Sequence, residues 1–244
     1  MLPLLLACLP PILDSGDSAP DTAPAVDTGD TAPDPVTLRF TLTNTSAAGD
    51  LSTSAGPTDI ALAPGLLVVH DPGWSLFTLG AVAEDTPLEP LAEDGDPTAL
   101  QAALAADPAV REVLLLSVKD DTTYAAAPMH PGEHASVLAA VSADENVSFL
   151  AMFGQSNDVV VATAPGGVAG LSGDGLAALS LGLYDVGTEV NQEPGAGSDQ
   201  APRQAAPDTG AAEGGTITAL SGTDSSGWTW PDPTTFATLV PTAE

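Results

Sequence analysis

The stretch VTLRFTLTN, residues 36–44, alternates apolar and polar side chains without a break. One face of the extended chain then carries only apolar side chains, those of Val36, Leu38, Phe40 and Leu42. Since successive side chains of a strand point to opposite faces, this alternation predicts a half-buried β-strand. The folded domain is therefore expected to begin at residue 36.

Further short apolar runs follow along the chain, and turn residues separate nearly all of them. They cover residues 66–70, 75–79, 113–118, 136–141, 147–152 and 159–163, with weaker candidates at 216–220 and 235–240. One helical signal interrupts them at residues 96–108, DPTALQAALAADP, where Asp96 can cap a helix and Leu100 and Leu104 share a face. Many strands, one short helix and long polar loops predict an all-β fold, an antiparallel β-sandwich.

The charge balance excludes some classes of partner. The 244 residues contain 4 Lys and Arg against 33 Asp and Glu, a net charge of -29. Such a chain repels nucleic acid and anionic lipid, and it attracts divalent cations or cationic partners. We therefore expect no nucleic-acid partner. The single cysteine, Cys8, excludes an intramolecular disulfide and a cysteine-based zinc site.

The N-terminus reads MLPLLLACLPP, and its segment Leu5-Leu6-Ala7-Cys8 resembles the lipobox of bacterial lipoproteins. Residues 1–13 are therefore predicted to be a signal peptide and lipobox region, with lipidation at Cys8 as the only membrane attachment. The protein would then be an outer-membrane or cell-surface lipoprotein, or secreted. The segment lacks a basic region before its leucines, so an unmodified buried thiol stays the alternative.

Residues 14–35, DSGDSAPDTAPAVDTGDTAPDP, consist of Asp, Ser, Thr, Gly, Ala, Pro and one Val in near-repeating units. Like charges and prolines favour an extended chain, which predicts a disordered acidic linker between the lipobox and the domain at residues 36–244. A calcium-binding tract is the alternative, but the spacing of its Asp residues matches neither an EF-hand loop nor the nonapeptide repeat.

No nucleophile motif in the chain is complete. The segments GQSND, residues 154–158, and GLSGD, residues 170–174, fall short of the pattern G-x-S-x-G, and no convincing helix follows either. The sequence therefore predicts a protein that is not an enzyme. A hydrolase or an enzyme subunit with an unrecognised site is the alternative.

Several motifs occur in the order seen in spondin-N domains, particularly in their bacterial members, and the match runs from about residue 36 to the end of the chain. They are APGLLVVHD at residues 63–71, LFTLGAVAEDTPLEPLAEDGD at 76–96, PGEHASVLAAV at 131–141, VSFLAMFGQSND at 147–158 and LYDVGTEVNQEPGAGSDQAPRQ at 183–204. The chain departs from the family at Val159, where those domains usually carry an aromatic residue.

The resemblance implies a C2-like antiparallel β-sandwich without catalytic activity, which binds Ca²⁺ through loop carboxylates at one edge. Asp185 and Glu189 flank Gly187 in the loop, and Asp158 follows a strand, so the expected metal ligands are Asp158, Asp185 and Glu189. Without the resemblance, the same residues favour a capped turn. The implied role is adhesion or extracellular interaction with a protein or glycan.

The lipobox predicts that Cys8→Ser moves the protein from the membrane to the aqueous phase, because a stable anchor requires the acylated thiol. Detergent-phase partitioning after expression in a bacterial host measures this, with Ser15→Ala as a control that should stay in the membrane fraction. Globomycin should block processing of the wild type. A wild-type protein found only in the aqueous phase would contradict the lipoprotein interpretation.

Overall fold

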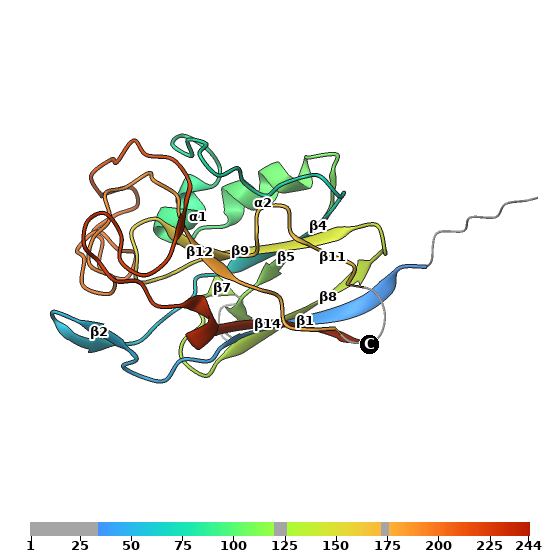
Figure 1. The fold of residues 1–244 in the computed structure, drawn as a ribbon, viewed down its shortest axis with the longest axis horizontal. Coiled ribbons are helices and arrows are strands. Elements are labelled where there is room, and N and C mark those ends of the chain that lie inside the picture. The colour runs from blue at the N-terminus through green and yellow to red at the C-terminus, as the bar shows by residue number, and fades with distance from the viewer. Residues whose placement is uncertain (1–33, 120–125, 172–175) are drawn as a thin grey trace, which may run out of the picture. The chain divides into compact units, whose positions relative to one another are not determined.

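The predicted all-β fold is confirmed by the computed structural model, which describes residues 34–119, 126–171 and 176–244. Its strands pair in antiparallel sheets that form a sandwich (Figure 1). The expected lipobox with Cys8 and nearly all of the expected linker lie outside the described residues. No helix among the described residues is long and apolar enough to cross a membrane.

The smaller sheet has three strands and is built around the strand that the opening stretch predicts. Strand β1, Val36–Asn44, lies between β8, His134–Val141, and β14, Ala237–Ala243, and is antiparallel to both. Leu38, Phe40 and Leu42 have no exposed surface. The alternation in the sequence therefore gives the face of β1 that is buried.

The larger sheet has seven strands, in the order β13-β12-β10-β9-β4-β5, with β11 paired to β9. These strands are β4, Gly65–His70; β5, Val110–Leu116; β9, Asn146–Met152; β10, Val159–Ala162; β11, Val168–Ala169; β12, Gly182–Asp185; and β13, Thr218–Leu220. The central strands β4, β9 and β10 are apolar along nearly their whole length because both of their faces are covered.

The main core fills the space between the two sheets. Phe40 of β1, Phe149 of β9 and Leu239 of β14 belong to one cluster of buried side chains with the inward residues of β4 and β10. The alternate residues of the large sheet, such as Leu66 and Leu150, belong to a second cluster on the opposite face. The large sheet is thus the middle of three layers (Figure 1).

Two helices form the third layer, where the sequence predicted one. The expected helix is α2, Thr98–Ala105, and an additional short helix, α1, Glu89–Asp94, precedes it. Six residues are too few to show a helical period, so the pattern of α1 was missed. Its end is marked by Gly95, whose φ of 69° is left-handed and whose added Cβ would lie 2.7 Å from that of Ala63.

The strand predicted at residues 75–79 is wrong, since this segment forms bends and turns. Leu76 and Phe77 instead cover the helix side of the large sheet: Phe77 is buried and its ring lies 4.8 Å from that of Tyr184. A short apolar run indicates that a segment is buried, but it does not indicate whether the segment is a strand or a loop that covers the sheet.

The remaining elements are short. They are the hairpin strands β2, Leu51–Thr53, and β3, Gly56–Thr58; the pair β6, Val118–Lys119, and β7, Ala126–Ala127; and the 3₁₀ turn η1, Pro233–Thr235. The weaker strand candidates near the C-terminus are confirmed as β13 and β14.

A long polar segment, residues 186–217, joins β12 to β13 and is named the acidic loop here. Its two ends run side by side: Glu213 N donates to the Thr188 carbonyl at 2.8 Å, and Gly215 N donates to the Gly187 carbonyl at 2.8 Å. Gly187 has a φ of 76°, and an added Cβ would lie 2.7 Å from the backbone nitrogen of Thr216. The return of the loop therefore depends on a glycine at position 187.

The packing of β1 predicts the effect of a cavity. Leu42→Ala removes a side chain with no exposed surface and should lower the free energy of unfolding by about 2–5 kcal/mol. Leu138→Ala on neighbouring β8 is the matched control, because that leucine is 47% exposed and its loss should cost less than about 1 kcal/mol. Urea denaturation measures both, and equal losses would contradict the assigned faces.

Candidate metal centre

Three carboxylates converge where β10 begins and β12 ends. Asp158 immediately precedes β10, and Asp185 is the last residue of β12 and pairs with Val159 across the sheet. Glu213 comes from the returning end of the acidic loop. One carboxylate oxygen from each of Asp158, Asp185 and Glu213 lies within 4.8 Å of the others, and these three residues are named the metal centre here.

Backbone N–H groups hold the two aspartates in place. Asp158 Oδ2 accepts from the backbone nitrogens of Thr188 at 2.8 Å and Glu189 at 3.1 Å. Asp185 Oδ1 accepts from the backbone nitrogen of Gly187 at 3.0 Å, and its Oδ2 accepts from Asn191 Nδ2 at 2.5 Å. The acidic loop is therefore fastened to the sheet by both carboxylates.

Two oxygens at this centre have no donor. Asp158 Oδ1 and Asn191 Oδ1 are buried side-chain atoms without a hydrogen-bond partner among the described residues. Asp158 itself has no exposed surface. Buried acceptors are nearly always satisfied in folded proteins, so the carboxylate of Asp158 requires either a proton or a cation.

Burial and mutual repulsion make it unfavourable for all three carboxyl groups of the metal centre to be ionised at once. Burial raises the pKa of Asp158 to about 8, and the charges of Asp185 and Glu213 add to this effect, whereas the two backbone N–H groups act against it. Burial also raises the pKa values of Asp185 and Glu213. The salt bridges among the described residues are made by Arg39 and Arg111 and do not reach this centre.

The spacing of the oxygens fits a divalent cation. Ca²⁺ binds oxygen ligands at about 2.3–2.6 Å, so two ligands on opposite sides of the ion lie about 5 Å apart. The oxygens of the centre lie within 4.8 Å of one another and meet this condition. All of them are hard oxygen donors. Ca²⁺ and Mg²⁺ prefer such ligands more strongly than Zn²⁺ does.

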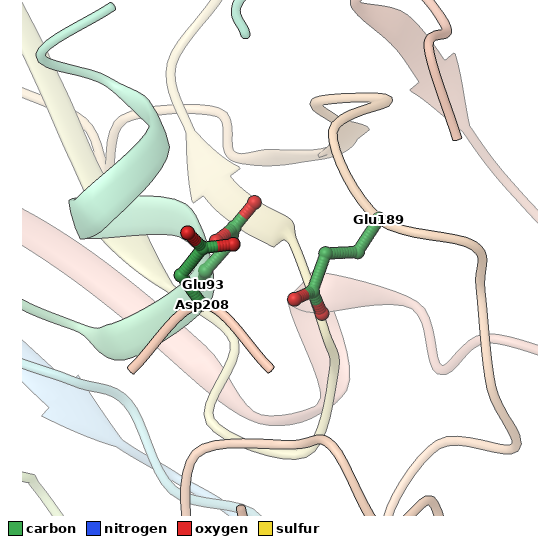
Figure 2. Close-up of side chains that lie close together, drawn as sticks. All are labelled: Glu93, Glu189 and Asp208. Atoms are coloured by element: carbon green, nitrogen blue, oxygen red, sulfur yellow. The ribbon is translucent and has the colours of Figure 1, made fainter. Parts of the chain in front are cut away.

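The structure does not bring the side chain of Glu189 to this centre. Figure 2 shows its carboxylate facing Glu93 of α1 and Asp208 of the acidic loop, and these three form a second acidic cluster. Glu189 Oε1 accepts from the backbone nitrogen of Gly210 at 2.7 Å, and Oε2 accepts from Asn157 Nδ2 at 3.2 Å. Of the three ligands expected from the sequence, Asp158 and Asp185 lie together, and Glu189 contributes only its backbone N–H.

The second cluster, Glu93, Glu189 and Asp208, differs from the metal centre in its bonding. Burial raises the pKa of Glu93 to about 7, with contributions from the charges of Glu189 and Asp208. A proton on Glu93 therefore reduces the repulsion near neutral pH. Both oxygens of Glu189 have donors, so no buried oxygen here requires a cation.

Glu213 was not expected from the sequence as a member of the metal centre, nor was Asn191, which donates to Asp185 beside it. Asn191 follows Asp185 by six residues in the segment DVGTEVN, so its presence in the resembling motif was a usable signal. Glu213 lies 28 residues after Asp185, in a stretch with no periodic pattern. Only the backbone pairing of the two loop ends brings it to the centre.

Of the two serines in the incomplete nucleophile motifs, the structure describes only Ser156. Ser156 of GQSND is fully buried, and its Oγ donates to the Phe153 carbonyl at 2.6 Å. The serine of GLSGD lies outside the described residues. One Ser–His contact was not expected: His70 Nε2 lies 2.8 Å from Ser148 Oγ, but both residues have no exposed surface.

No family model matches this sequence, and no protein of curated function matches it significantly. The resemblance to spondin-N domains therefore stays an interpretation of the motifs.

The buried carboxyl of Asp158 predicts how stability depends on pH without metal. The unfolded chain releases this proton near pH 4 and the folded protein near pH 8, so between about pH 4 and 8 the folded state binds more protons. The contribution of Asp158 to the free energy of unfolding therefore falls as pH rises through this range. Asp158→Asn should remove this loss and raise the melting temperature at pH 8 in chelator.

Thermal denaturation at a series of pH values measures the effect. Asp144→Asn, an exposed carboxylate, is the control and should leave the pH profile unchanged. Parallel profiles for wild type and Asp158→Asn would contradict a buried titrating group at position 158.

Proposed function

We propose that this chain is a surface-anchored, non-catalytic domain of the spondin-N kind, which binds Ca²⁺ and mediates adhesion or extracellular interaction with a protein or glycan. The observation that carries the calcium proposal is the buried, unpartnered Oδ1 of Asp158 beside Asp185 and Glu213. The antiparallel sandwich agrees with the fold that the resemblance implies.

A cation removes two costs at once. A buried acceptor without a partner costs about 1–3 kcal/mol, and more when it is charged. When ionised, the buried carboxylates of Asp158 and Asp185 also repel each other and the exposed carboxylate of Glu213. A divalent ion turns this repulsion into attraction and gives Asp158 Oδ1 a partner.

Calcium fits the donor set better than the other common divalent ions. The centre offers carboxylate oxygens from Asp158, Asp185 and Glu213, and the amide of Asn191 adds a neutral oxygen nearby. Ca²⁺ accepts six to eight oxygens in flexible geometry, whereas Mg²⁺ requires a tighter octahedron. Zn²⁺ favours nitrogen and sulfur ligands, which this centre lacks among its described residues.

Binding at this centre would stabilise the acidic loop against the sheet. Its ligands come from the residue before β10, the end of β12 and the returning end of the loop, so one ion would join segments far apart in the sequence. A ligand that binds only the folded state stabilises it by RT ln(1 + [L]/Kd), about 2.7 kcal/mol at a hundredfold excess over Kd. The loop edge then becomes a rigid surface for a partner.

The non-catalytic part of the proposal is supported by the burial of the nucleophile candidates. Ser148 and His70 make a contact of hydrolase type, but both have no exposed surface, and an added Cβ on Gly167 would lie 2.6 Å from Ser148 Oγ. The backbone at Gly167 thus closes over the pair. A hydrolase is the alternative, and turnover of an ester or peptide substrate that Ser148→Ala abolishes would favour it.

Surface attachment rests on the lipobox-like sequence at Cys8 and the acidic linker that follows it. A linker of this composition would separate the sandwich from the membrane. The high negative charge of the chain argues against binding to anionic lipid through the domain itself.

The decisive test compares three carboxylates by isothermal titration with Ca²⁺. Asp185→Asn and Glu213→Gln each remove one charge from the metal centre and should weaken binding at least about tenfold, since affinity depends on the number of charged ligands. Glu189→Gln should leave calcium affinity within about twofold, because its side chain lies in the second cluster. The wild-type melting temperature should rise with Ca²⁺ and less with Mg²⁺.

The two possible failures of this test differ. If wild type binds no calcium, the proposed function is wrong. If Glu189→Gln loses binding and Glu213→Gln keeps it, calcium binds through the set expected from the sequence and the geometric assignment is wrong.

A further inference from the structure

A pocket of about 410 Å³ lies next to the acidic loop. Its walls come from the segment before β4, the end of α1, the approach to β8, the end of β9 and the acidic loop. Most of the lining is apolar and short, from Ala61, Ala63, Pro64, Pro128, Met152 and Pro202. A volume of this size is within the range of small-ligand sites.

The floor of the pocket is fixed by close backbone contacts. Gly154 N donates to the Ala61 carbonyl at 2.9 Å, and Ala61 N donates to Gln155 Oε1 at 2.7 Å. Gly95 lies so close to Ala63 that a side chain at position 95 would displace it. The pocket is therefore formed before any ligand enters it.

The acidic loop supplies the outer wall, with Ala201 and Pro202. Two hydrogen bonds hold this wall: Gln204 Nε2 donates to Asp94 Oδ1 at 2.7 Å, and Gly195 N donates to the Gln155 carbonyl at 2.9 Å. Asp158 and Asp185 fasten the start of the same loop. The pocket and the metal centre thus share one structural segment.

Two acidic residues, Asp59 and Asp94, and one histidine, His130, line the pocket, and no lysine or arginine does. Among the described residues, hydrogen bonds to these carboxylates engage only Oδ1, from Gly49 N and from Gln204 Nε2. Arg203 follows Pro202 directly, but its Nε donates to the Gly197 carbonyl at 2.8 Å. The ion pairs of the described residues therefore leave Asp59 and Asp94 without a lysine or arginine partner.

We infer that this pocket takes an arginine or lysine side chain of a partner protein. The methylene stem of such a side chain covers the apolar lining, and its cationic head lies at the carboxylates of Asp59 and Asp94. The net charge of -29 attracts a basic partner over a longer range. This inference rests on the proposed role as an interaction module and names the chemistry of its partner.

The test uses ¹⁵N-labelled domain in calcium-containing buffer, titrated with two capped tripeptides, Gly-Arg-Gly and Gly-citrulline-Gly. Citrulline has nearly the shape of arginine without its charge. The arginine peptide should shift the amide signals of Gly95, Gly154 and Gln155 with a millimolar Kd, the range expected for so small a ligand. The Kd of the citrulline peptide should be at least about fivefold higher than that of the arginine peptide.

Two matched double variants locate the charge. Asp59→Asn with Asp94→Asn keeps an Oδ1 acceptor for Gly49 N and Gln204 Nε2, and it should weaken the arginine peptide about fivefold. Asp34→Asn with Asp144→Asn changes the net charge equally at exposed positions elsewhere and should leave the Kd within about twofold. An unchanged melting temperature shows that each variant is folded.

The outcomes separate this inference from the proposed function. Equal binding of the arginine and citrulline peptides, shifts outside the pocket, or no shift at millimolar peptide would each overturn the pocket assignment while calcium binding stays intact. Arginine binding in a protein that does not bind calcium would support the pocket and overturn the metal centre.

Discussion

The burial of Asp158 between the large sheet and the acidic loop is the constraint on which the functional end of this protein depends. One of its oxygens accepts two backbone N–H groups from residues 188 and 189, and the other has no donor among the described residues. The first set of bonds fixes where the chain goes after β12. The orphaned oxygen sets a requirement for a proton or a cation, because a bare buried carboxylate is costly.

The rest of the domain makes that burial possible. The large sheet is covered on one face by the small sheet and on the other by α1 and α2, so β10 and β12 are held firmly on both sides (Figure 1). Carboxylates at the ends of such strands have little freedom to move apart. The rigid sheet therefore keeps these carboxylates close together at one edge of the sandwich. On a mobile loop, the same carboxylates could move apart.

The acidic loop connects two properties of that edge. Its start is fastened to the metal centre, and its middle forms a wall of the pocket through the contact of Gln204 with Asp94. Glu93, the neighbour of Asp94 on α1, meets Glu189 and Asp208 in the second cluster. A change in charge at either cluster therefore acts on the same segment, through which the proposed ion and the proposed partner would affect each other's binding.

The sequence by itself determined the longer strands of the sandwich but not β12, and its likeness to spondin-N motifs singled out two of the three clustered carboxylates. The alternation of Leu38, Phe40 and Leu42 indicates the buried face directly, and Asp158 and Asp185 belong to the motifs GQSND and DVGTEVN that resemble spondin-N domains. Only the tertiary structure decided that Glu213 joins them and that Glu189 turns toward Glu93. The return of the acidic loop is held by backbone hydrogen bonds between residues 187–190 and 211–215, and backbone groups are the same in every residue. Backbone hydrogen bonds do not require particular side chains, so they produce no pattern in the sequence. The position of Glu213 at the metal centre therefore could not be predicted from the sequence.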